Sequence, residues 1–103
     1  MKIGMLNDLA ERAVICAYRR NKINPMQSKE NLFKSQKKAV HEEAVELLIA
    51  KGNVISEHIP QYTEDVEEAA DVIISTLVYL RLAGVDINEV IEAKMKYNEK
   101  RED

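Results

Sequence analysis

Residues 63–84 read TEDVEEAADVIISTLVYLRLAG, and this stretch decides the class of fold. Its acidic first turn suits the positive end of a helix dipole, and Gly84 is typical of a helix end. From Asp71 onward, apolar residues occupy nearly every side of the predicted helix, which is typical of a helix buried at the centre of a bundle. The stretch therefore predicts a central helix that begins near Thr63 and ends at Gly84.

Three further helices are predicted around it, at about residues 5–20, 29–51 and 87–101. Asn24-Pro25 ends the first of them, and Ser28 is a candidate N-cap for the second. Gly52 is expected in the left-handed conformation that ends the second helix. Asp86, with Glu89 three residues on, forms a capping-box pattern that begins the last helix. We therefore expect an all-α fold, a four-helix chain that forms an oligomeric helical bundle.

Composition agrees with this class and limits the function. The 103 residues make one domain, residues 1–103, and only three Gly and two Pro argue against an all-β fold. A formal net charge of −3 makes binding to a nucleic acid polymer through overall charge unexpected. The one cysteine, Cys16, excludes an intramolecular disulfide and is expected in the core or an interface.

The longest apolar-leaning stretch, residues 72–80, is far short of the roughly 20 residues that a membrane span needs. No targeting segment is visible at the N-terminus, where Asn7 and Asp8 interrupt the apolar residues. We therefore expect a cytoplasmic protein with no membrane contact.

Charge is distributed unevenly along the chain. Residues 1–40 carry a local net charge of +6, residues 41–71 carry −8 and residues 72–103 carry −1. Folding gathers the acidic block into one region, where either the basic flanks or a bound metal must offset it.

The acidic block contains two pairs of carboxylates at helical spacing. In the second helix, whose apolar face is predicted to include Ala44 and Leu48, Glu43 and Glu46 are three residues apart and face the bundle interior. Glu42 points away from that face. The predicted central helix repeats the spacing with Glu68 and Asp71, again on a mostly apolar face.

Four carboxylates that face a core need a cation or must remain solvated, because burying them unpaired costs several kcal/mol each. Oxygen ligands without imidazole or thiolate favour Mg²⁺, with Mn²⁺ as a possible substitute. The alternative is two ordinary solvated helix faces.

The last helix carries Lys94, Asn98 and Arg101 on one face, at spacings of four and three residues. Two cations and an amide in a row suit phosphate oxygens, which arginine can bind through two hydrogen bonds. A basic helix C-terminus that favours the helix dipole is the alternative.

Together, Glu42-Glu43-x-x-Glu46, Glu68-x-x-Asp71 and Lys94-x-x-x-Asn98-x-x-Arg101 resemble the MazG-like all-α nucleoside triphosphate pyrophosphohydrolases. The resemblance covers residues 33–101, about two-thirds of the chain. It implies hydrolysis of a (deoxy)nucleoside triphosphate to the monophosphate and pyrophosphate, with nucleotide-pool cleaning as a possible role.

The resemblance also implies site residues, carried over position by position. The implied metal ligands are Glu43, Glu46, Glu68 and Asp71, with Mg²⁺ as the cofactor. Lys94, Asn98 and Arg101 would bind the substrate, and Glu46 is the candidate catalytic base.

A related branch hydrolyses phosphoribosyl-ATP and usually has a histidine shortly after the aspartate, where this chain has Ile73 and Ile74. Outside the enzymes, a non-catalytic helical interaction protein is the alternative. In either case the apolar central helix needs more cover than three helices readily supply, so we expect a homodimer or a dimer of dimers.

Overall fold

The computed structural model describes residues 4–102 and contains, within them, four α-helices. Their bounds are α1 Met5–Arg19, α2 Lys29–Ile49, α3 Glu64–Leu82 and α4 Ile87–Lys100. The described residues form no β-strand, although an isolated antiparallel β-bridge joins Ile55 to Thr63. The predicted all-α class is confirmed, and each helix lies within two residues of its expected bounds at either end.

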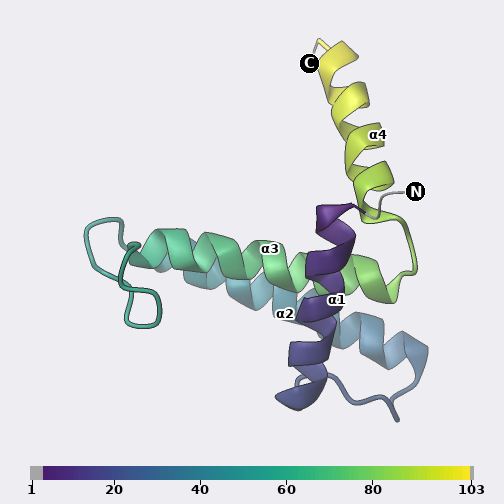
Figure 1. Ribbon diagram of the computed structural model, residues 1–103, viewed down its shortest axis with the longest axis horizontal. Helices are drawn as coiled ribbons and strands as arrows, with labels where there is room; N and C mark the ends of the chain where they lie inside the picture. Colours follow the sequence, from purple (N-terminus) through teal and green to yellow (C-terminus); the bar gives the residue numbers. More distant parts are fainter. Residues whose placement is uncertain (1–3, 103) are drawn as a thin grey trace.

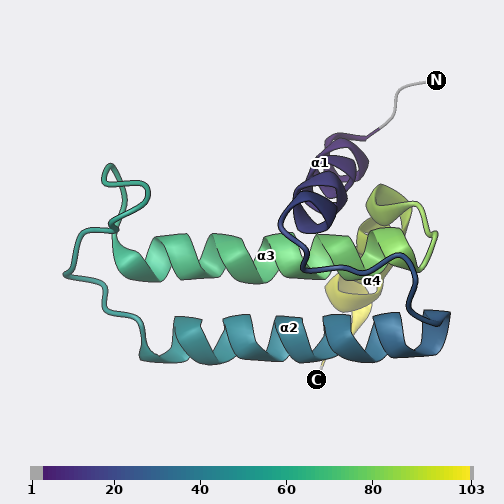
Figure 2. The same ribbon diagram turned by 90° about the horizontal axis from the view of Figure 1, so that it is seen from below.

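The arrangement places α3 at the centre, because α1, α2 and α4 all contact it. α2 and α3 lie side by side and antiparallel, joined by the loop of residues 50–63 at one end (Figure 2). α1 crosses α3 on the other side, and α4 leaves the far end of α3 and extends away from the pair (Figure 1). The two acidic motifs therefore lie on neighbouring helices.

Side-chain caps explain where two of the helices, α2 and α4, begin. The Ser28 hydroxyl accepts a hydrogen bond from Asn31 N at 3.1 Å, and the Asp86 carboxylate accepts one from Glu89 N at 3.3 Å. Both predicted N-caps are confirmed. The side chain of Asn7, on α1, accepts from Ile87 N at 2.9 Å and so ties the start of α4 to α1.

Two glycines behave differently at the helix ends. Gly84 has a φ of +76° after α3, the left-handed conformation that favours glycine. The expectation for Gly52 was wrong, because α2 ends at Ile49 and its C-cap, Ala50, is extended. A Cβ added at Gly52 would lie 3.3 Å from Asp65 Oδ2, so glycine here permits a close approach to α3.

The packed face of α2 differs from the predicted one. Ala44 and Leu48 were expected to face the core, but both are exposed, and 83% of Leu48 is accessible. Gln36 is buried instead, and its amide donates to the Ser75 carbonyl on α3 at 2.9 Å. The packed stripe is centred nearer Glu43, because α3 packs against that side of α2.

The buried core of one chain is small, with six buried hydrophobic residues among those described: Ala10, Val14, Ile23, Leu77, Val78 and Ile87. α3 is central, yet Ile73 and Ile74 are 59% and 47% exposed in the single chain. Cys16, expected in the core or an interface, is exposed. Within residues 4–102, no helix is long and apolar enough to cross a membrane.

Candidate metal centre

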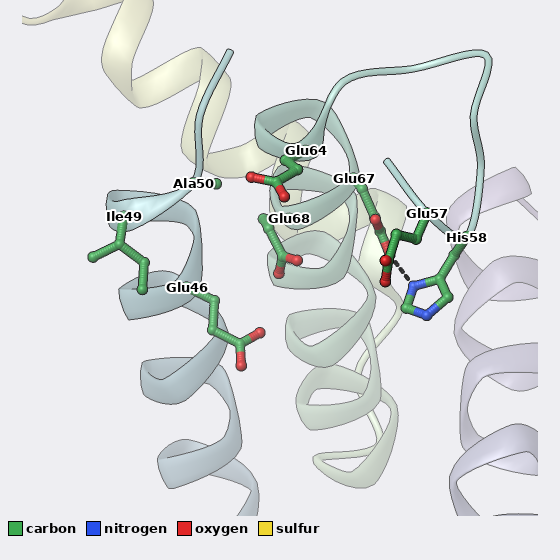
Figure 3. Close-up of a pocket in the computed structure, with 8 residues that line it drawn as sticks. All are labelled: Glu46, Ile49, Ala50, Glu57, His58, Glu64, Glu67 and Glu68. Carbon is green, nitrogen blue, oxygen red and sulfur yellow. Dashed lines mark hydrogen bonds and ion pairs between the residues drawn. The ribbon is translucent and has the colours of Figure 1, made fainter. Parts of the chain in front are cut away.

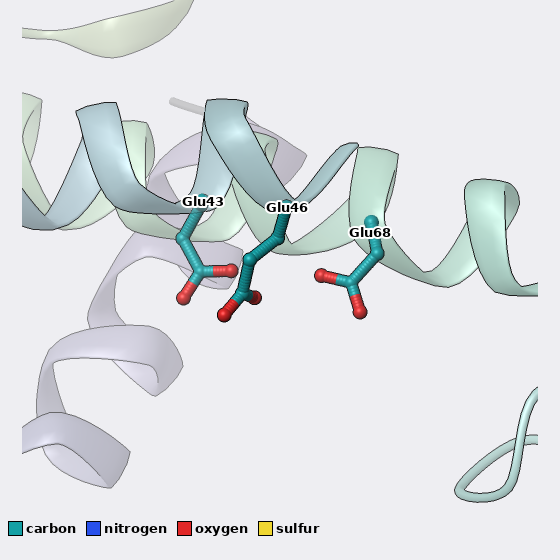
Figure 4. Close-up of side chains that lie close together, drawn as sticks. All are labelled: Glu43, Glu46 and Glu68. Carbon is teal, nitrogen blue, oxygen red and sulfur yellow. The ribbon is translucent and has the colours of Figure 1, made fainter. Parts of the chain in front are cut away.

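Three carboxylates from two helices meet between α2 and α3 (Figure 4). Glu43 and Glu46 come from consecutive turns of α2, and Glu68 comes from the first half of α3. One oxygen from each lies within 4.8 Å of the others, with Glu46 between its two neighbours. This spacing allows one cation to contact all three side chains.

Two oxygens of this group are unusual for a folded protein. Glu43 Oε2 and Glu68 Oε2 are buried and have no hydrogen-bond partner among the described residues. Buried polar atoms are normally satisfied, and an unsatisfied carboxylate oxygen is costly. Their orientation fits a cation with oxygen ligands.

The same crowding shifts the acidities in the metal-free chain. Burial, followed by the neighbouring Glu46 carboxylate, raises the pKa of Glu68 to about 7. Burial also raises the pKa of Glu43 and of Asp71, and repulsion from Glu46 adds to both shifts. Desolvation is the largest cause of all three shifts, and repulsion between the carboxylates adds to it.

Asp71 lies in a second, overlapping group with Glu67 and Glu68, again with one oxygen of each within 4.8 Å of the others. The four predicted ligands therefore do not form one compact set. They are spread over two groups of three that share Glu68, and the second group includes Glu67, which was not among the predicted ligands.

Glu67 is already engaged by the loop between α2 and α3. Ser56 Oγ donates a hydrogen bond to its Oε1, and His58 Nδ1 lies 2.8 Å from its Oε2 (Figure 3). The bond from Ser56, followed by the one from His58, lowers the pKa of Glu67. Glu67 thus anchors the loop to α3, whereas the buried oxygens without a partner among the described residues belong to Glu43 and Glu68.

A pocket of about 390 Å³ opens beside these carboxylates, within the size range of small-molecule sites. Its lining residues come from the end of α2, the loop and the start of α3: Glu46, Ile49, Ala50, Glu57, His58, Glu64, Glu67 and Glu68. The pocket is strongly acidic, so an anionic ligand could enter it only with a cation.

Two basic residues at and just after the C-terminal end of α1 also act on the carboxylates. Arg20 lowers the pKa of Asp71 and Lys22 lowers that of Glu43, although burial outweighs both effects. The basic N-terminal block therefore offsets part of the acidic charge, which is one of the two alternatives that the charge distribution left open.

The predicted substrate-binding residues lie elsewhere. Lys94, Asn98 and Arg101 are exposed on or just after α4, which contacts α1 and α3 but, among the described residues, not α2. The Lys94 ammonium lies 4.6 Å from the Tyr97 ring centre. α4 extends away from the paired helices (Figure 1), so a single chain does not bring these residues to its own acidic group.

The fold is all-α, and its paired carboxylates lie on neighbouring helices. Residues 17–98 match the model of the phosphoribosyl-ATP pyrophosphohydrolase family. The chain belongs to this family, which lies within the MazG-like all-α superfamily. It is an enzyme of the hydrolase class that acts on acid anhydrides, specifically nucleotide phosphoanhydrides.

The match includes both acidic motifs and reaches Asn98 on α4. The matching family is the phosphoribosyl-ATP branch, which the absence of a histidine shortly after Asp71 had made less favoured. That difference therefore does not place the chain outside the family. Comparison with curated proteins finds no match. Comparison with solved structures finds none either.

Enzymes of this family are typically dependent on a divalent metal, and the donor set fits one. All the donors are carboxylate oxygens, which hard cations prefer, and two of them are buried with no hydrogen-bond partner in the described part of the chain.

The raised pKa of Glu68 predicts how metal-free stability varies with pH. The folded protein holds this proton up to about pH 7, whereas the unfolded chain releases it near 4.5, so protonation favours folding. In EDTA, the melting temperature should rise as the pH falls from about 8 to about 5.5. Glu68→Gln should flatten the rise. A melting temperature that falls over this window in the wild type would contradict the prediction.

Proposed function

We propose that the protein is a Mg²⁺-dependent nucleoside triphosphate pyrophosphohydrolase. Water would attack the α-phosphorus, the anhydride bond to the β-phosphate would break, and pyrophosphate would leave. The observation that carries the proposal is a pair of buried oxygens, of Glu43 and Glu68, that have no hydrogen-bond partner within residues 4–102 and lie in a carboxylate cluster of a pyrophosphohydrolase fold.

We assign Glu43, Glu46, Glu68 and Asp71 as the residues that would hold the metal. Mg²⁺ would supply Lewis-acid stabilisation of phosphate charge and lower the pKa of a bound water. Two overlapping groups of carboxylates leave room for more than one ion.

Glu46 is the proposed catalytic base. It is exposed and lines the pocket, so one of its oxygens can face solvent while Glu43 and Glu68 lie on either side. A carboxylate in that position can orient a water molecule and accept its proton.

The phosphate-binding assignment of Lys94, Asn98 and Arg101 requires a second copy of the chain. α4 carries these residues away from its own acidic group. The exposed apolar residues on α2 and α3, among them Leu48, Ile49, Ile73 and Ile74, favour a symmetric homodimer or a dimer of dimers. In such an assembly, one chain's α4 would complete its partner's site.

Subunit mixing tests this arrangement. Glu43→Gln removes an acidic ligand and Lys94→Ala removes a phosphate contact, so each variant alone should be nearly inactive. A mixed dimer has one site with both residues intact, so an equal mixture should recover up to about a quarter of wild-type activity. Light scattering should give at least twice the 11.8 kDa of one chain. No recovery on mixing, or a monomer at micromolar concentration, would contradict the shared site.

The reaction itself is tested with a substrate panel. Purified protein with Mg²⁺ is offered the common ribonucleoside and deoxyribonucleoside triphosphates, oxidised and deaminated forms, and phosphoribosyl-ATP, with pyrophosphate release as the readout. Activity on damaged nucleotides would support nucleotide-pool cleaning. The family match supports phosphoribosyl-ATP as the second candidate, because it carries the same α–β anhydride. No pyrophosphate from any of them would overturn the proposed reaction.

A further inference from the structure

Among the described residues that line the acidic pocket, His58 is the one with a basic side chain. The loop between α2 and α3 carries it to the start of α3, beside Glu67 and Glu57 (Figure 3). His58 has no role in the reaction proposed above. A nucleoside triphosphate that enters a pocket lined by five glutamates needs positive groups near its phosphates, and His58 is placed to provide one.

The position of the His58 ring is held by hydrogen bonds. Its Nδ1 lies 2.8 Å from Glu67 Oε2, and the other Glu67 oxygen accepts a bond from Ser56. Ser56 is only 1% exposed, and its hydroxyl also accepts from Ile59 N at 3.1 Å. A buried serine and a helix carboxylate thus orient an imidazole that is itself 81% exposed.

This arrangement leaves Nε2 available to a ligand. It lies on the side of the ring away from Glu67 (Figure 3). The hydrogen bond to Glu67 also raises the pKa of His58, which favours the imidazolium form, in which both ring nitrogens donate.

We propose that His58 is a further substrate-contacting residue of this enzyme, whose Nε2–H donates to a phosphate oxygen of the bound nucleotide. The assignment rests on the proposed function, since it concerns the same pocket. Glu67 and Ser56 act as positioning residues, which hold the ring without touching substrate.

Two substitutions separate contact with the ligand from anchoring of the loop. In His58→Asn, the amide nitrogen can take the place of Nδ1 and keep the bond to Glu67, but nothing replaces Nε2. In His58→Gln, the longer side chain places its amide nitrogen near the position of Nε2. His41→Asn, at the other histidine and exposed on α2, is the matched control.

Binding of a non-hydrolysable α,β-methylene nucleoside triphosphate with Mg²⁺ is the primary readout. His58→Asn should weaken binding by at least about tenfold, the range expected for a lost hydrogen bond to a charged group. KM should rise more than kcat falls, the melting temperature should stay within error, and His58→Gln should recover part of the affinity. His41→Asn should bind as the wild type does.

Equal affinity in His58→Asn and the wild type would overturn the assignment, as would a loss that His58→Gln shares in full. Failure of the proposed function can be distinguished from failure of the His58 assignment. In that case the wild type would bind the nucleotide analogue but release no pyrophosphate from any substrate of the panel.

Discussion

Glu43→Gln should lower the rate of pyrophosphate release by at least about 100-fold. Loss of a group that only hydrogen-bonds a metal ligand costs up to about 100-fold, so loss of a ligand itself should cost at least as much. Glu43 Oε2 is buried, has no hydrogen-bond partner among residues 4–102, and lies beside Glu46 and Glu68. An amide keeps the shape of the side chain but is a poorer ligand for Mg²⁺. Steady-state kinetics at saturating Mg²⁺ measures the effect.

Glu42→Gln is the matched control, because Glu42 is the neighbouring glutamate and is exposed on the outer side of α2. It should leave the rate close to that of the wild type. If both substitutions reduced activity equally, the orientation of α2 and the assignment of Glu43 would both be wrong.

Mg²⁺ should stabilise the folded protein strongly. The metal binds the assembled carboxylates and has little affinity for the unfolded chain, so at 100 times its dissociation constant it adds about 2.7 kcal/mol. For a domain near 100 residues, each kcal/mol raises the melting temperature by about 4–8 °C. Melting curves with EDTA and with millimolar Mg²⁺, at constant ionic strength, measure the rise.

Asp71→Asn should act in two directions. Burial and the carboxylates of Glu67 and Glu46 raise the pKa of Asp71, so removing its charge should stabilise the metal-free protein. The same change removes a proposed ligand and should shrink the rise caused by Mg²⁺. Asp8→Asn, exposed near the start of α1, is the control and should keep the full response. An identical Mg²⁺ response in Asp71→Asn and the wild type would defeat the shared metal site.

The local features of this protein were predictable because neighbouring residues determine them. The caps at Ser28 and Asp86 depend on hydrogen bonds across three residues, and the sequence shows both partners. The inward orientation of Glu43 follows from helical periodicity, and its buried oxygen agrees with it. The same periodicity predicted that Ala44 and Leu48 face the core, and this was wrong. Periodicity indicates an apolar stripe along α2 but not which edge of that stripe α3 covers.

The sequence by itself determined four helices and two carboxylate pairs, since helix formation and i,i+3 spacing are local properties. Only the tertiary structure decided which groups meet. The loop of residues 50–63 folds back so that Ser56 and His58 reach Glu67, a contact across nine to eleven residues that no periodicity indicates. The direction of α4, which separates Lys94 from the carboxylates of its own chain, depends on the turn at Gly84 and on packing against α1. Such contacts depend on the path of loops and on packing between helices, and the spacing of residues along one helix predicts neither.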